Sequence, residues 1–119
     1  MADELTVTSI LDYRKGTPNQ QFMSVLKTLD VTGTNHIRNR QTIGTTEEAI
    51  LMGDVAVGGY AIFVNRDATN FVSIRPGAGT ANLIKIPAGE QAGPFRLAVA
   101  PFAIADTAAV ELEYVLIDP

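Results

Sequence analysis

Residues 59–76, GYAIFVNRDATNFVSIRP, decide the fold that we predict for this chain. Apolar and β-branched residues lie on either side of a polar connection, residues 65–70, which is the pattern of two β-strands joined by a tight turn. We therefore expect a β-hairpin here. Because a lone hairpin is at best marginally stable in water, the remainder of the chain should supply strands that cover its apolar faces.

Further short segments with the alternation of a strand lie on both sides of this hairpin, separated by glycine, proline and asparagine. The predicted strands cover residues 4–10, 22–31, 35–43, 49–52, 83–86, 95–99 and 110–117. A helix is the weaker alternative for residues 22–31, and residues 45–48 could instead cap one helical turn. The pattern predicts an all-β protein, an antiparallel β-sandwich or jelly roll, and argues against a parallel sheet, which needs crossover helices.

The length of 119 residues is typical of one domain, and the absence of cysteine means that packing or assembly must stabilise it without disulfides. We expect residues 1–20 to form an extended N-terminal arm, or an edge strand plus a loop, and residues 21–119 to form the β-sandwich domain. An extended arm rises ~3.3 Å per residue, so it could reach over a neighbouring subunit.

The charge of the chain argues against several classes of partner. The net charge is −4, whereas nucleic-acid binding depends on clustered Lys and Arg, and anionic membranes repel an acidic protein. No apolar run is long enough to cross a bilayer, and residues 1–4 do not resemble the start of a secretory signal. Charged residues make up only 18% of the chain, below the roughly 25% typical of soluble domains, which suggests that a partner covers part of the surface.

Candidate catalytic side chains are few. The one histidine, His36, shares a predicted strand face with Arg38 and Arg40, whose positive charges oppose its action as a base. Glu111 and Glu113 share a face of the last strand, and we interpret them as a solvated face that pairs across strands with Arg38 or Arg40. We expect no enzymatic activity and no catalytic residues.

Cofactor and metal sites are not expected either. The chain has no cysteine and no histidine pair, and its acidic residues do not follow the spacing of a calcium loop. The glycine-containing segment 77–80 lacks the lysine and the following helix of a phosphate-binding loop. Sugar binding is a minor possibility, since the chain has three tyrosines but no tryptophan to stack on a sugar.

Apolar residues on both faces of the central strands form the one unusual feature. In residues 60–65 and 71–74 both alternating sets contain large apolar side chains, and charged residues are scarce between residues 76 and 105. One face has covering candidates within the chain, namely Leu112, Tyr114 and Leu116. The other face is covered either by the chain itself or by another subunit, and we single out Tyr60, Phe63 and Phe71 as candidate interface residues.

Several turn and strand signatures lie between residues 43 and 117: TTEEA at 45–49, GD at 53–54, GY at 59–60, NRDATNFVSI at 65–74, PAGE at 87–90, FRL at 95–97 and ADTAAVELEY at 105–114. Together they resemble those of a small virion protein of tailed bacteriophages. The resemblance implies a structural role in the particle, without catalytic residues.

The function that this resemblance implies is capsid decoration or cementing. Such a protein would act as a symmetric oligomer, a homotrimer, that binds across subunits of the major capsid protein on the outside of the virion after synthesis in the host cytoplasm. The alternative is a component attached to the neck or tail, with a glycan-binding tip. Neither implies a nucleic acid, a membrane or a cofactor as a partner.

Overall fold

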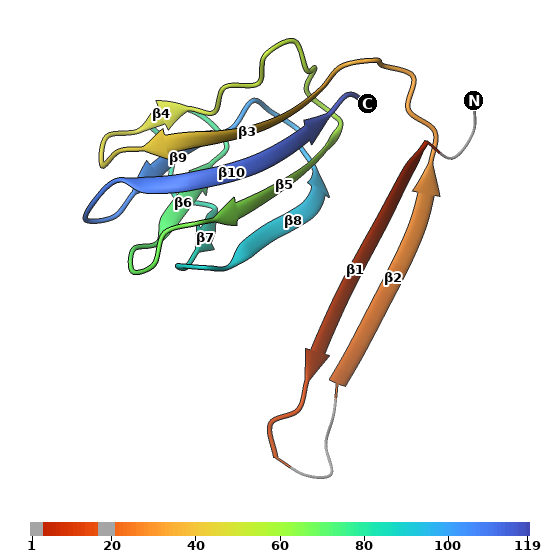
Figure 1. Ribbon diagram of the computed structural model, residues 1–119, viewed down its shortest axis with the longest axis horizontal. Coiled ribbons are helices and arrows are strands. Elements are labelled where there is room, and N and C mark those ends of the chain that lie inside the picture. Colours follow the sequence, from red (N-terminus) through yellow and green to blue (C-terminus); the bar gives the residue numbers. More distant parts are fainter. Residues whose placement is uncertain (1–3, 17–20) are drawn as a thin grey trace. The chain divides into compact units, whose positions relative to one another are not determined.

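The computed structural model describes residues 4–16 and 21–119 (Figure 1). The chain divides into two compact units, Met1–Thr32 and Gly33–Pro119. The described residues form strands and turns, and they contain no helix long and apolar enough to cross a membrane.

The first unit is a two-stranded hairpin. β1 (Leu5–Tyr13) and β2 (Gln21–Leu29) pair antiparallel, from Leu5 opposite Leu29 to Tyr13 opposite Gln21. The strand predicted for residues 22–31 is confirmed as β2, and the weaker helical alternative is not found. One expectation is corrected: the strand that we place in the sandwich from residue 21 onward pairs with the N-terminal strand instead. Alternation predicts that a segment is a strand, but it does not predict which strand will be its neighbour.

The second unit confirms the predicted all-β antiparallel sandwich, with two four-stranded sheets (Figure 1). One sheet has the order β3-β10-β5-β8 and the other has the order β4-β9-β6-β7. The strands are β3 (His36–Ile43), β4 (Glu48–Ala49), β5 (Tyr60–Asn65), β6 (Val72–Arg75), β7 (Ile84–Ile86), β8 (Gln91–Arg96), β9 (Phe102–Ala105) and β10 (Val110–Ile117).

The apolar core of this unit draws on both sheets. Every second residue of β10 is buried, and β5 and β6 add Phe63, Val72 and Ile74. Leu112, Tyr114 and Leu116 are all buried in this core, but the expectation that they cover a face of the central strand β5 is wrong, because β10 pairs beside β5 in the same sheet. Alternation of period two thus turns one side of β10 inward and the other outward.

The expected hairpin in residues 59–76 is wrong, although both of its strands exist. β5 pairs with β10 and β8, whereas β6 pairs with β9 and β7, so residues 66–71 cross from one sheet to the other. Buried Asn65 holds the crossing, because its side-chain amide donates to the carbonyl oxygens of Asn70 and Ile86, each at 2.9 Å. A buried polar side chain that satisfies two backbone carbonyl groups fixes a sharp change of sheet where a tight turn was expected.

Two strands near the C-terminus differ from the expected ones. β8 covers Gln91–Arg96, not residues 95–99, and β9 was not predicted. Proline inside a segment argues against a strand, but here Gly93 and Pro94 lie where the register between β5 and β8 shifts. Gly93 has a φ of 99°, and a Cβ on it would lie 2.6 Å from the Ala61 carbonyl oxygen, so glycine allows this irregular pairing.

Candidate functional site

The outward face of the β3-β10-β5-β8 sheet carries a cluster of charged side chains. Alternate residues of β3 and β10 point outward, and the register places Arg40 opposite Glu113 and Arg38 opposite Val115. The next strand, β5, adds Val64 beside Glu113. Charged and apolar side chains therefore share this face.

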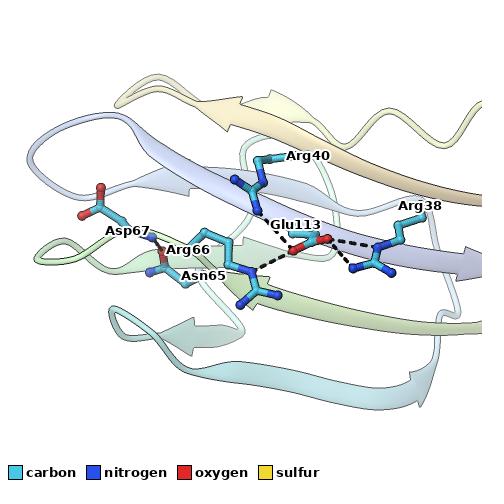
Figure 2. Close-up of polar contacts among 6 residues, drawn as sticks. All are labelled: Arg38, Arg40, Asn65, Arg66, Asp67 and Glu113. Carbon is cyan, nitrogen blue, oxygen red and sulfur yellow. Dashed lines mark hydrogen bonds and ion pairs between the residues drawn. The ribbon is translucent and has the colours of Figure 1, made fainter.

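Glu113 lies at the centre of the cluster and contacts three arginines (Figure 2). Its Oε2 accepts from Nε and Nη2 of Arg38 at 3.0 and 2.9 Å, and its Oε1 accepts from Nε of Arg66 at 2.7 Å. Nη2 of Arg40 lies 3.5 Å from Oε1. The carboxylate is 13% exposed, whereas the three arginine side chains are 47–72% exposed. We name Arg38, Arg40, Arg66 and Glu113 the arginine cluster.

The arginines keep Glu113 ionised. Hydrogen bonds from Arg66 and then Arg38 lower the pKa of Glu113 from 4.5 to about 2, against the opposing effect of partial burial. A carboxyl group with such a low pKa is a poor proton donor near neutral pH, so Glu113 is unsuited to act as a general acid. Three guanidinium groups around one carboxylate leave the cluster with excess positive charge, although the whole chain is acidic.

The crossing between the sheets places Arg66 in the cluster. Its backbone N–H donates to the Glu111 carbonyl oxygen at 2.8 Å, and the following N–H, of Asp67, donates to Oδ1 of Asn65 at 2.9 Å. Asp67 in turn accepts from the backbone N–H groups of Asn70 and Thr69, and these bonds lower the pKa of Asp67. Figure 2 shows Asn65 and Asp67 beside Arg66.

The charged residues singled out from the sequence have different contacts in the structure. His36 lies exposed on β3. The predicted pairing of Glu113 with Arg38 and Arg40 across the strands is confirmed. Glu111 has a different contact, because it accepts a hydrogen bond from the hydroxyl of Thr42. Among the described residues, no group of three or more histidine and acidic side chains could hold a metal ion.

The three candidate interface residues do not form one surface. Phe63 is fully buried between Phe95 and Tyr114, with ring centroids 6.1 and 6.0 Å away. Tyr60 is half-buried and has Arg96 over its ring at 4.7 Å, and Phe71 is half-buried with Lys85 over its ring at 4.2 Å. Phe63 therefore belongs to the core, because its position in β5 turns it inward together with Ala61.

Arginine side chains cover part of the second face of β5, for which the sequence suggested no internal cover. Ile62 and Val64 are half-buried, and with Arg38, Arg66 and Glu113 they line a shallow hollow of about 70 Å³. The apolar stems of arginine can cover apolar surface while the guanidinium stays in water. The long side chains of the arginine cluster thus provide cover that apolar patterning does not reveal.

A larger apolar hollow of about 280 Å³ lies elsewhere on the sandwich. Its lining includes Ile74, Leu83, Ile84, Phe95, Leu97 and Val99. Leu83 is 70% exposed there, so the hollow presents unprotected apolar surface to the solvent.

The most exposed apolar surface belongs to the hairpin. Seven large apolar side chains of β1 and β2 are each more than half exposed: Ile10, Leu11, Tyr13, Phe22, Met23, Val25 and Leu26. Soluble monomers rarely leave so many apolar side chains together in water. The sequence contains a signal for this surface, because both alternating sets of β1 and β2 include apolar residues, although the pattern alone places residues 22–31 in the sandwich.

Comparisons of this chain with protein-family models, with curated proteins and with solved structures found no match.

Proposed function

We propose that this protein is a structural protein of a bacteriophage virion, a decoration or cement protein that binds across subunits of the major capsid protein and stabilises the head. The observation that carries the proposal is the β1–β2 hairpin with its seven exposed apolar side chains. An apolar element of this kind is suited to burial against another protein chain. The resemblance of residues 43–117 to small virion proteins is the reason for placing this partner in a bacteriophage particle.

Burial of the hairpin would contribute much of the free energy of assembly. A fully buried Leu, Phe or Met side chain stabilises by roughly 1.5–3 kcal/mol relative to an exposed one. Part of that gain offsets the loss of freedom when a small protein is fixed on a shell. Several such side chains on each copy would hold the protein in place without any reaction.

The sandwich offers two further surfaces that suit contacts with a capsid. The arginine cluster provides exposed guanidinium groups that could bind carboxylates of a neighbouring chain, and the hollow around Leu83 could accept an apolar side chain. We also infer a jelly roll, because the chain changes sheet at every connection from β3 to β10 except the one between β6 and β7, a pattern compatible with two interlocked Greek keys. Jelly rolls are common among viral capsid proteins.

The proposal is tested with phage heads that lack the protein. Purified full-length chain is added to the heads, bound and free protein are separated by sedimentation, and the temperature at which the heads release DNA is measured. We expect saturable binding and a higher release temperature. Absence of co-sedimentation, together with an unchanged release temperature, would refute a decorating role.

Imaging of the particle separates decoration from the alternative site. Decoration predicts many copies spread over the shell in register with the capsid lattice. A few copies confined to the neck or tail would favour the neck or tail component instead.

A further inference from the structure

The outward face of the β3-β10-β5-β8 sheet has an apolar centre. Its two middle strands, β10 and β5, bury every second side chain in the core and turn the others outward. The outward set includes Val115 and Ile117 of β10 and Tyr60, Ile62 and Val64 of β5, all of them half-buried. Part of this apolar surface forms the shallow hollow of about 70 Å³.

Arginines lie around this apolar centre. Arg38 and Arg40 lie on the outer strand β3, Arg66 follows β5, and Arg96 lies on the other outer strand, β8, opposite Tyr60. They are four of the six arginines of the chain. The outward side chains of the same sheet include only two acidic ones, both on β10, so the charge of this face is +2, whereas the whole chain carries −4. We name the apolar centre and these four arginines the arginine-rimmed face.

Two of these arginines have hydrogen-bond donors left for a partner. Arg66 donates to Glu113 through Nε alone, and Nη2 of Arg40 lies 3.5 Å from the same carboxylate. Within the part of the chain that the structure describes, the terminal nitrogens of Arg66 have no other acceptor. A guanidinium group can bind a carboxylate through two parallel hydrogen bonds. Arg40 and Arg66 can therefore each bind a further carboxylate while Glu113 stays in place.

We propose that the arginine-rimmed face binds a segment of another protein in which an apolar side chain is flanked by aspartate or glutamate. The apolar side chain packs on Ile62, Val64 and Val115, and the flanking carboxylates bind the arginines around them. An apolar centre within a polar rim is the usual arrangement of a contact between two proteins. This inference names the chemistry of the partner in the proposed function, and it rests on that function for placing the partner in a phage particle.

Other anionic partners fit this face less well. Nucleic acids bind through clustered positive charge and, when single-stranded, through stacking of bases on aromatic rings, but this chain has a net charge of −4. Among the outward side chains of the described strands of this sheet, Tyr60 is the one aromatic residue. Arg96 lies over its ring at 4.7 Å, in the place where a base or a sugar would stack.

The size of the face predicts weak, reversible binding. Strands about 4.8 Å apart and about seven residues long give four strands a face of roughly 450 Å², so a contact buries roughly 900 Å² in total. Interfaces of this size belong to weak and transient contacts. The positive rim attracts an acidic partner most strongly at low salt, where charges are least screened.

The test measures the fluorescence anisotropy of a short labelled peptide, in which one leucine lies between glutamates, during titration with the full-length chain. One control peptide has lysine in place of glutamate, and another has serine in place of leucine. Duplex DNA and heparin are titrated under the same conditions. We expect saturable binding of the glutamate peptide that weakens as salt rises, weaker binding of the serine peptide and no binding of the lysine peptide.

Three substitutions that each change the charge by one unit locate the site. Arg40→Gln removes the arginine that contacts Glu113 at the longest distance, and it should weaken binding of the peptide about threefold. Glu111→Gln removes a negative charge from the face and should tighten binding about threefold, while its amide oxygen can still accept from the Thr42 hydroxyl. Lys85→Gln, on β7 of the other sheet, is the matched control and should leave binding unchanged.

The near-ultraviolet circular dichroism of buried Tyr114 checks that the sandwich of each variant is folded. The inference is overturned by any of four results: no binding at low salt, equal binding of the lysine peptide, tighter binding of DNA or heparin than of the glutamate peptide, or equal effects of Arg40→Gln and Lys85→Gln.

The outcome is separable from the test of function. A chain that binds the glutamate peptide as expected but binds no phage heads would keep this inference and refute decoration. A chain that binds heads but not the peptide, with head binding unaffected by Arg40→Gln, would do the reverse.

Discussion

Glu113 shows how a single residue can organise one face of a sheet. Its carboxylate joins Arg38 and Arg40 of β3 to Arg66, which follows β5. The contact therefore spans three neighbouring strands. Because the arginines are largely exposed, solvent and salt weaken each ion pair. The cluster therefore stabilises the sheet through the combined geometry of its three ion pairs.

The ion pairs of Glu113 make stability depend on pH. Its pKa falls from 4.5 to about 2 on folding, so its stabilising contribution is fully present above pH 4.5 and is lost as the pH falls toward 2. We predict that Glu113→Gln lowers the melting temperature by a few degrees at pH 7, because three arginines lose their common partner.

Thermal unfolding at several pH values checks this prediction. The difference between Glu113→Gln and the unaltered chain should shrink steadily below pH 4.5. Glu90→Gln, at an exposed glutamate, is the matched control and should behave like the unaltered chain. An equal difference at pH 7 and at pH 2.5 would show that the effect of the substitution is not ionic.

At the scale of elements, close approach of backbone segments decides how β5 begins. Gly59 precedes this strand, and a Cβ at that position would lie 1.7 Å from the Ile117 carbonyl oxygen of β10. The N–H of Leu97 also donates to the Gly59 carbonyl oxygen, at 3.0 Å. Three segments that are distant in the sequence therefore meet at one residue without a side chain.

We predict that Gly59→Ala destabilises the sandwich by about 3 kcal/mol or more, because the backbone of β10 must move to accommodate the methyl group. Chemical denaturation measures the loss. Gly44→Ala is the control, since a Cβ there meets nothing within 4 Å, and it should change the free energy of unfolding far less. Similar losses for both variants would contradict the assigned close approach.

On the scale of the whole molecule, the two units differ in how well they are covered. β10 lies between β3 and β5 and buries every second side chain, whereas β1 and β2 pair only with each other. Local opening requires less free energy where few apolar side chains are buried. The hairpin and the sandwich should therefore respond differently to assembly.

Hydrogen exchange measured by mass spectrometry tests this difference. At low concentration we predict that backbone amides of β1 and β2 exchange at least about a hundredfold faster than those of β10. Adding phage heads that lack the protein should slow exchange in the hairpin and leave β10 unchanged. Equal protection of both units in dilute solution would contradict it.

Sequence reasoning predicted much of the fold but less of the candidate site. Period-two alternation identified β10, β3 and the two central strands, and the pairing of Glu113 with arginines followed from facing positions on neighbouring strands. Phe63 was assigned to an interface because the cover of β5 could not be foreseen. Arg66 joins the cluster only because residues 66–71 cross between the sheets, which depends on the hydrogen bonds of the buried Asn65 side chain.

The sequence by itself determined that the chain would form short antiparallel strands, because side-chain alternation and turn residues act over a few neighbouring positions. Only the tertiary structure decided that residues 59–76 link two sheets and that residues 21–29 leave the sandwich to form a hairpin with the N-terminal strand. The physical reason is that strand pairing depends on contacts between distant segments. A strand's own pattern states which faces need cover, and it is the rest of the molecule that determines what covers them.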